Sequence, residues 1–203
     1  MAEQGVVKCW VEINPIAVTP ENTPKLWDIR PKPPSTFEVR ICVFNCKDVE
    51  MMDWEGTCDA FCRGFFDSKE DVQETDTHYR NQDGKPDFQY RLVYQIQNDR
   101  KDYKYSLQMY DRDFFKSNDM IGEVQINLRQ LVEDCALVKK PLQLNKSYYN
   151  DVLRADNKPF LVLDFDRNDD SRFWVDMVAR DPKTRANIVR GKVKMQIDVL
   201  PVE

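Results

Sequence analysis

The chain has 203 residues, and 30 Lys and Arg against 35 Asp and Glu give it a net charge of −5. With 41% hydrophobic and 32% charged residues, the composition is that of a globular chain with a sizeable core, not of a disordered or collagen-like one. No apolar run approaches the roughly 18 residues of a membrane span, and we expect no signal peptide at the start. The acidic balance disfavours a general nucleic-acid binder.

The dominant pattern along the chain is an alternation of apolar and polar residues, which is typical of half-buried β-strands. In chain order it predicts strands at 6–13, 36–44, 88–94, 105–110, 121–128, 160–165, 172–178 and 192–200. A helical period occurs only at 128–134. Many short alternating strands with little helix predict an all-β fold, an antiparallel sandwich.

Two irregular segments interrupt the strands. Residues 14–35 contain six prolines, which exclude regular ladder pairing and indicate an extended surface connector. Residues 144–159 form a second, polar connection. We therefore divide the chain into a strand with a Pro-rich connector, residues 1–35, and a compact domain, residues 36–203.

The residues of familiar enzyme sites are scarce. The only histidine is His78, and the six cysteines form no C-x-x-C pair, so a zinc site is disfavoured and reduced thiols of a cytosolic protein are the better interpretation. No G-x-S-x-G motif and no Gly-rich phosphate loop occurs. A metal-dependent hydrolase would lack a recognisable base, and we expect no enzyme activity.

Two acidic clusters follow predicted strands and are the strongest candidates for a binding site. The first contains Asp53 and Asp59, and the second contains Asp111, Asp113 and Asp119. Carboxylates that converge repel one another and destabilise the fold, and Ca²⁺, which takes six to eight oxygen ligands, would relieve that repulsion. Aspartates are also common in solvated turns, but the spacing of these five is a specific pattern. Calcium is favoured over magnesium, which prefers a tight octahedron with fewer protein ligands, and two or more calcium ions could share bridging aspartates.

The spacing resembles the C2 domains of synaptotagmins, conventional protein kinases C and ferlins. Residues 53–61 are similar to the first calcium loop of these domains, with Cys58 and Ala60 in place of the usual Ser and Pro, and residues 111–122 are similar to the third. Residues 27–31, 37–40, 74–80, 84–91, 173–174 and 191–195 resemble the C-terminal, membrane-proximal C2 domains of ferlins. The resemblance covers nearly the whole chain.

The resemblance implies an eight-stranded antiparallel C2 β-sandwich of the type II permutation, with an extra N-terminal strand and irregular additions. In type I the first strand precedes residue 37; in type II its equivalent comes last, and the chain offers both candidates, at 6–13 and 192–200. By resemblance, the chain is a calcium-dependent phospholipid-binding module in vesicle fusion, exocytosis or membrane repair. The alternative is a calcium-independent scaffold for protein–protein or interdomain contacts.

The same resemblance assigns roles at the loop tips. Trp54, Phe114 and Phe115 are expected to insert into the membrane, although the two phenylalanines could instead fold back on the sandwich. Arg112 and Lys116 are expected to reach lipid phosphates. The expected partners are phosphatidylserine, a phosphoinositide and other domains of a tail-anchored parent protein, at the cytoplasmic face of a vesicle or plasma membrane, with this fragment itself soluble.

A basic patch that could bind phosphoinositides is indicated only weakly. Its candidates are Arg80, Lys85, Arg91, Lys101 and Lys104, with acidic residues between them. A solvated strand face is the favoured interpretation.

Overall fold

The computed structural model describes residues 9, 11, 13, 33–51, 55–114, 117–156 and 161–202. The chain divides into two compact units, Met1–Pro33 and Pro34–Glu203. The predicted strand at 6–13 and the connector at 14–35 lie largely outside the described residues. Of the predicted strand, Cys9, Val11 and Ile13 are described, and they are exposed and belong to no strand.

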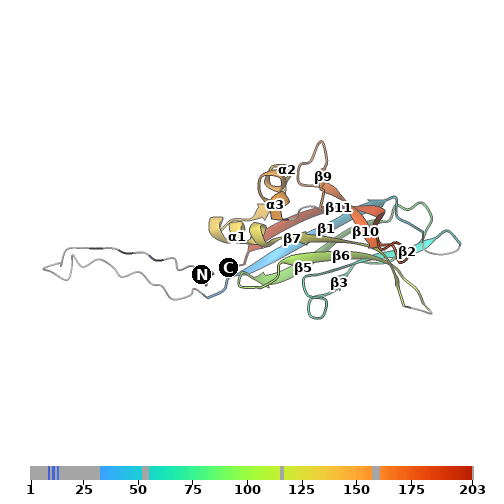
Figure 1. Cartoon of the computed structure of the whole chain (residues 1–203), viewed down its shortest axis with the longest axis horizontal. Coiled ribbons are helices and arrows are strands. Elements are labelled where there is room, and N and C mark those ends of the chain that lie inside the picture. Colours follow the sequence, from blue (N-terminus) through green and yellow to red (C-terminus); the bar gives the residue numbers. More distant parts are fainter. Residues whose placement is uncertain are drawn as a thin grey trace, which may run out of the picture. The chain divides into compact units, whose positions relative to one another are not determined.

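The second unit is an antiparallel β-sandwich with eight principal strands among the described residues (Figure 1). These strands are β1 (Thr36–Lys47), β2 (Cys58–Phe65), β4 (His78–Asn81), β5 (Asp87–Gln97), β6 (Lys104–Asp111), β7 (Asp119–Asn127), β10 (Phe173–Arg180) and β11 (Asn187–Pro201). Three two-residue strands are added to them: β3 (Gln73–Glu74), β8 (Leu142–Gln143) and β9 (Asp164–Phe165). The predicted all-β class is therefore confirmed.

The strand order settles the permutation. Hydrogen bonds connect the strands in the order β3-β2-β6-β7-β10-β11-β1-β5, and β4 pairs with β2 on its outer side. The C-terminal strand β11 thus lies between β10 and β1, the position that an N-terminal strand fills in the other permutation. This is the expected type II arrangement.

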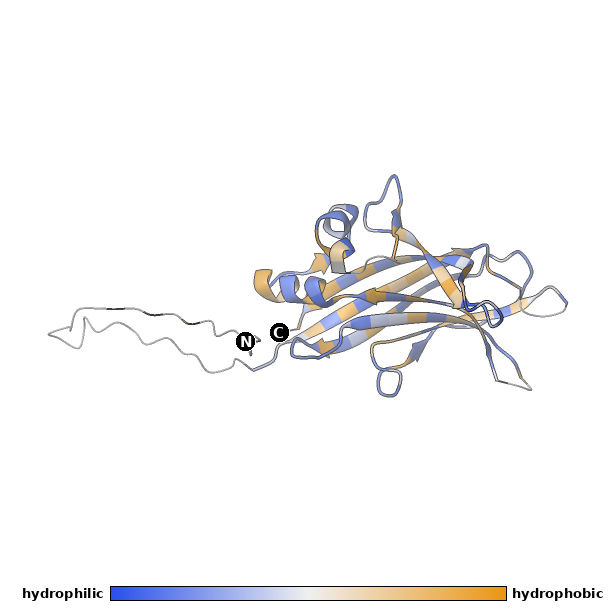
Figure 2. Ribbon diagram, viewed as in Figure 1, coloured by the Kyte–Doolittle hydropathy of each residue, from blue (hydrophilic) through white to orange (hydrophobic). Residues whose placement is uncertain are grey.

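Alternation of apolar and polar residues builds the core between the two halves of the sandwich. Along β1 the inward side chains are Phe37, Val39, Ile41 and Val43, all at most 2% exposed, and Figure 2 shows the same alternation along the other long strands. The rings of Tyr94 on β5 and Tyr105 on β6 meet across the halves, with centroids 5.5 Å apart.

The helices are short additions to the sandwich. The predicted helix at 128–134 is confirmed and extends further, as α1 (Arg129–Val138), which buries Leu131, Val132 and Cys135. The segment expected to be a polar connector contains helical turns instead, α2 (Lys146–Tyr148), a π-helical turn η2 (Tyr149–Leu153) and α3 (Arg154–Asp156). In the described ranges no helix is long and apolar enough to cross a bilayer.

Candidate functional site

The two acidic loops lie at the same end of the sandwich. The first loop follows the end of β1 and precedes the start of β2, and the second lies between β6 and β7. Because β2, β6 and β7 are antiparallel neighbours, the start of β2, the end of β6 and the start of β7 coincide: Ala60 pairs with Asp111, and Asp111 pairs with Asp119. In Figure 1 this end lies opposite the C-terminus.

Hydrogen bonds to the main chain fix two of the predicted calcium ligands. Asp111 is only 3% exposed, and its Oδ1 accepts the amide hydrogen of Asp59 at 2.7 Å. The Oδ1 of Asp59 in turn accepts the amide hydrogen of Arg80 at 2.7 Å, and the Asp59 carbonyl accepts that of Arg112 at 3.0 Å. The two carboxylates therefore join β2, β4 and β6 at the base of the loops.

The loop between β6 and β7 is closed by its own side chains. The amide of Asp113 donates to Oδ1 of Asn118 at 3.1 Å, and Asp119 begins β7 opposite Asp111. The fifth predicted ligand, Asp53, lies outside the described residues. Within the part of the chain that the structure describes, no three His, Cys, Asp or Glu side chains are grouped closely enough to hold a metal ion.

The donor chemistry nevertheless suits one ion class. All five predicted ligands are carboxylates, and Asp59, Asp111 and Asp119 occupy neighbouring register positions on three adjacent strands. Hard carboxylate oxygens in flexible loops are ligands that Ca²⁺ accepts readily. The residues present therefore fit calcium in type.

An exposed aromatic pair lies beside the acidic residues. Phe114 is 75% exposed and does not fold back on the sandwich, and Tyr79 on β4 is 59% exposed. Their rings stack with centroids 6.5 Å apart and an interplanar angle of 13°. Sequence reasoning missed Tyr79, which follows His78 in a strand too short to show a pattern. Trp54, Phe115 and Lys116 lie outside the described residues.

Arg112 lies over the outer face of β2 instead of extending past the loop. Its guanidinium lies 4.2 Å from the ring centroid of Phe61 and pairs with the carboxylate of Glu74 at 3.2 Å. Arg63 binds the other oxygen of Glu74 at 2.7 Å. A contact between Arg112 and a lipid phosphate would require it to leave this arrangement.

The five residues of the weakly indicated basic patch do not gather on one surface. Arg80 lies on β4 beside Asp59, whereas Lys104 begins β6, seven residues from Asp111, which is roughly 23 Å along a strand. Arg91 on β5 pairs with Cys42, in the other half of the sandwich.

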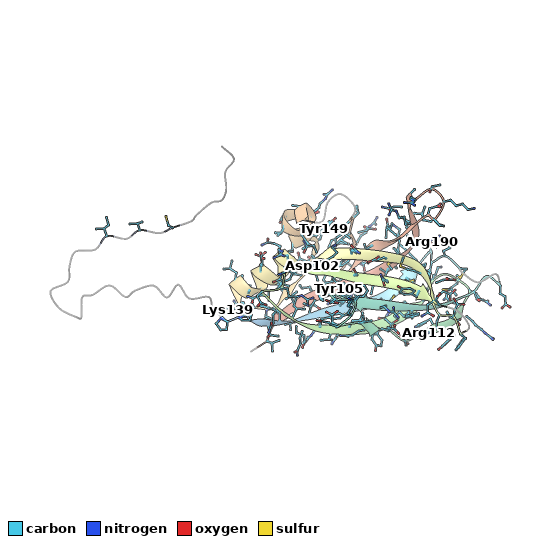
Figure 3. All side chains as sticks on the ribbon, turned by 60° about the horizontal axis from the view of Figure 1, so that its bottom comes forward. Asp102, Tyr105, Arg112, Lys139, Tyr149 and Arg190 are labelled. Atoms are coloured by element: carbon cyan, nitrogen blue, oxygen red, sulfur yellow. The ribbon has the colours of Figure 1, made fainter. Side chains whose placement is uncertain are left out.

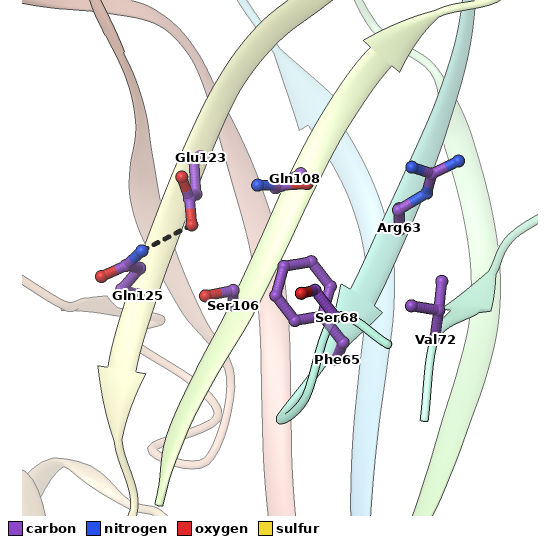
Figure 4. A pocket seen from close by; sticks show the side chains of 8 residues that line it. All are labelled: Arg63, Phe65, Ser68, Val72, Ser106, Gln108, Glu123 and Gln125. Carbon is purple, nitrogen blue, oxygen red and sulfur yellow. Dashed lines mark hydrogen bonds between the residues drawn. The ribbon is translucent and has the colours of Figure 1, made fainter. Parts of the chain in front are cut away.

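A polar pocket of about 380 Å³ lies on the outer face of β2, β6 and β7 (Figure 4). Its lining consists of Arg63, Phe65, Ser68, Val72, Ser106, Gln108, Glu123 and Gln125. Gln125 donates to Glu123 at 2.6 Å, and Arg63 is held by Glu74. The described lining contains neither histidine nor cysteine.

The cysteines behave as expected for reduced thiols. Cys9, Cys42, Cys46, Cys62 and Cys135 are free, and Cys46, Cys58, Cys62 and Cys135 are buried. Burial raises the pKa of the Cys46 thiol well above its ordinary value, which suppresses the reactive thiolate.

The strand order and the acid-bearing loops at one end define a β-sandwich of the C2 type. The sequence model of the C2 domain family matches residues 37–144, more than half of the chain. The chain belongs to the C2 domain family.

Curated relatives of the chain include ferlins, which confirms the predicted resemblance to this family. The chain is 24% identical over 224 residues to myoferlin of Xenopus tropicalis, covering 97% of this chain and 11% of that protein. It is 26% identical over 157 residues to Fer-1-like protein 4 of Mus musculus, covering 64% of this chain and 8% of that protein. The chain thus spans about a tenth of the length of these relatives.

A solved structure supports the fold. Human GIVD cytosolic phospholipase A2 matches 83% of this chain with a TM-score of 0.51 and 10% sequence identity, and the match covers 17% of that protein. At this identity the match concerns the fold alone.

Proposed function

We propose that this chain is a calcium-dependent module that binds anionic phospholipid membranes, with phosphatidylserine as the principal lipid. The module would belong to a ferlin-like protein that acts in vesicle fusion, exocytosis or membrane repair. One observation carries the proposal: two acid-bearing loops meet at one end of the sandwich beside an exposed aromatic pair, Tyr79 and Phe114. The membership in the C2 family and the ferlin relatives support it.

In the proposed mechanism Asp53, Asp59, Asp111, Asp113 and Asp119 would hold two or more calcium ions. Bound calcium would neutralise these acids and accept a lipid phosphate oxygen. Before binding, the clustered acids repel an anionic surface. The hydrogen bonds of Asp59 and Asp111 hold the loop bases in place, so that little reorganisation is needed.

The aromatic side chains would add hydrophobic binding energy. Phe114 is exposed and stacked on Tyr79, and transfer of one such ring from water to the lipid interface contributes roughly 1.5–3 kcal/mol. Trp54 and Phe115 have the same proposed role from their places in the two loops.

A thermal melt tests the calcium site. In EDTA, in excess calcium and in excess magnesium, we expect only calcium to raise the Tm. A ligand at 100 times its Kd stabilises by about 2.7 kcal/mol, which for a domain of this size is a rise of roughly 5–10 °C.

Two variants test whether the calcium-dependent rise in Tm arises from the proposed site. Asp111→Asn keeps the oxygen that accepts the Asp59 amide but removes the charge, so it should fold and lose the calcium response. Asp102→Asn is the matched control, because Asp102 accepts the Lys104 amide at the start of β6, at the far end of the strand. An unchanged Tm of the wild type in millimolar calcium and anionic vesicles would contradict the proposed calcium-dependent function.

A second candidate function is a calcium-independent scaffold that binds proteins or neighbouring domains. The observation that favours it is that no three acidic side chains form a ligand group within the described ranges. This function predicts that neither the Tm nor vesicle binding depends on calcium.

A further inference from the structure

We propose that the hairpin joining β10 to β11, residues 180–190 and here called the basic hairpin, is a calcium-independent site for the phosphate groups of an anionic membrane surface. This site is distinct from the acidic loops, and only its orientation toward the same membrane rests on the proposed function.

Charge is the first observation. The basic hairpin contains Arg180, Lys183, Arg185 and Arg190 but only one acid, Asp181. Arg180, Lys183 and Arg185 are exposed. No carboxylate of a described residue forms an ion pair with any of these three. Their charges are therefore available to a ligand.

The turn is preorganised by its single acid. Oδ1 of Asp181 accepts the amides of Lys183 at 2.7 Å and Thr184 at 3.0 Å. The main chain closes the turn with bonds from Asp181 to Ala186 and from Arg185 back to Asp181, both 2.9 Å. Asp181 is thus engaged by backbone amides, while the three cations remain exposed on a closed turn.

The base of the basic hairpin is fastened to the first acidic loop. The amide of Glu50 donates to the Arg190 carbonyl at 3.0 Å, and the Glu50 carboxylate pairs with the Arg190 guanidinium at 3.0 Å. Gly191 has a φ of 145°, and a Cβ there would lie 3.1 Å from the Cα of Val49. Figure 3 shows Arg190 and Arg112 at one end of the sandwich and Lys139 at the other.

This position favours a membrane as the ligand. The cations share an end with the exposed Tyr79 and Phe114 pair, and Val189 of the hairpin is itself 55% exposed. Exposed cations beside an exposed apolar residue suit the interface of an anionic bilayer. A free phosphate would use the cations but not the apolar side chain.

The experiment measures vesicle sedimentation of the full chain in EDTA at low ionic strength. Phosphatidylcholine vesicles with and without phosphatidylserine are compared, and inorganic phosphate serves as a soluble competitor. The wild type should bind only the phosphatidylserine vesicles, and high salt should release it. Each neutralised cation should weaken binding about fivefold, so Arg180→Gln/Lys183→Gln/Arg185→Gln should bind on the order of a hundredfold more weakly.

The matched control loses three positive charges at the other end of the molecule. Lys101→Gln/Lys104→Gln/Lys140→Gln changes exposed residues near the start of β6 and after α1, and it should bind as the wild type does. If both triple variants lost vesicle binding equally, the binding would depend only on the net charge of the chain, and the proposed site would be wrong. The proposal would also be wrong if the wild type did not bind phosphatidylserine vesicles in EDTA. It would equally be wrong if inorganic phosphate, at the same concentration as the phosphatidylserine, released all of the bound chain.

A further variant separates this site from the acidic loops. Asp111→Asn should bind in EDTA at least as well as the wild type, because it removes one repelling charge, and it should lose the increment that calcium adds. Calcium could leave vesicle binding of the wild type unchanged while Arg180→Gln/Lys183→Gln/Arg185→Gln still loses its binding in EDTA. In that case the proposed calcium-dependent function would be wrong, and the phosphate site on the basic hairpin would be supported. Thermal melts of all variants confirm that they are folded.

Discussion

At the scale of single residues, Asp111 shows how a proposed calcium ligand also supports the fold. It is nearly fully buried, and its bond to the Asp59 amide holds β2 against the end of β6. A buried carboxylate is tolerated when it is hydrogen-bonded or close to a cation. The loss of its charge and the loss of its acceptor oxygen therefore have different consequences, and for this reason Asn is the informative substitution at this position.

Gly64 is a second residue whose identity is dictated by its neighbours. A Cβ at Gly64 would overlap the hydroxyl oxygen of Tyr105 and lie 2.7 Å from that of Tyr94. Gly64→Ala should therefore destabilise the fold by about 1–3 kcal/mol through overpacking. Urea unfolding at equilibrium measures this change.

The control for Gly64→Ala is removal of the hydroxyl that it meets. The Tyr105 hydroxyl is buried and has no hydrogen-bond partner within the described ranges, so Tyr105→Phe alone should change stability little. In the double variant it should restore part of the loss. Equal stability of Gly64→Ala and the wild type would refute the packing argument.

At the scale of elements, the side chain of Gln73 bridges the edge strand β5 to the opposite half of the sandwich. Gln73 on β3 donates to the Val93 carbonyl at 2.5 Å and accepts the Val93 amide at 3.1 Å. A side-chain amide thus occupies an edge position that would otherwise be open to another strand.

Gln73→Ala should open this edge. Because both bonds are exposed, we expect a loss of about 0.5–1.5 kcal/mol and faster hydrogen exchange at the Val93 amide, measured by NMR. Gln95→Ala, at an exposed position of the same strand, should leave that exchange unchanged. Unaltered hydrogen exchange at the Val93 amide in Gln73→Ala would show that the two hydrogen bonds of Gln73 do not protect β5.

The elements also show what sequence patterns can and cannot predict. Strands such as β1 and β11 alternate buried and half-buried residues, and their pattern is sufficient to predict them. β2 was not predicted, because Phe61 on its outer face is buried beneath Arg112 and stacks on Tyr110, which destroys the alternation. The turns at 146–156 are too short to show a period, and burial of Tyr149 and Leu153 fixes them.

For the candidate site, the sequence predicts which residues the acidic loops contain. It predicts less well which other residues lie beside those loops in the folded chain. Acids that follow strands can be placed at strand ends from the pattern alone, and the register confirms that Asp111 and Asp119 meet. The proximity of Tyr79 to Phe114 and of residues 180–190 to the first loop depends on long-range pairing. No local pattern contains that information.

At the scale of the whole molecule, the last strand is central to the sandwich. β11 lies between β10 and β1 and contributes Val193, Met195, Ile197 and Val199, all fully buried. Burial of each such side chain contributes roughly 1.5–3 kcal/mol, or about 6–12 kcal/mol for the four, which is comparable with the 5–15 kcal/mol that stabilises a typical domain. We therefore expect the stability of the sandwich to depend on the pairing of β11 with β10 and β1.

Two truncations test this dependence. Deletion of residues 187–203 should leave a chain that does not unfold cooperatively, because β1 and β10 lose their shared partner. Deletion of residues 1–33 should preserve a cooperative melt at nearly the same Tm, because residues 34–203 form a compact unit of their own. Circular dichroism during heating distinguishes the outcomes. A cooperative melt of the C-terminal deletion would mean that another segment can take the place of β11, and the type I permutation would then be accessible to this sequence.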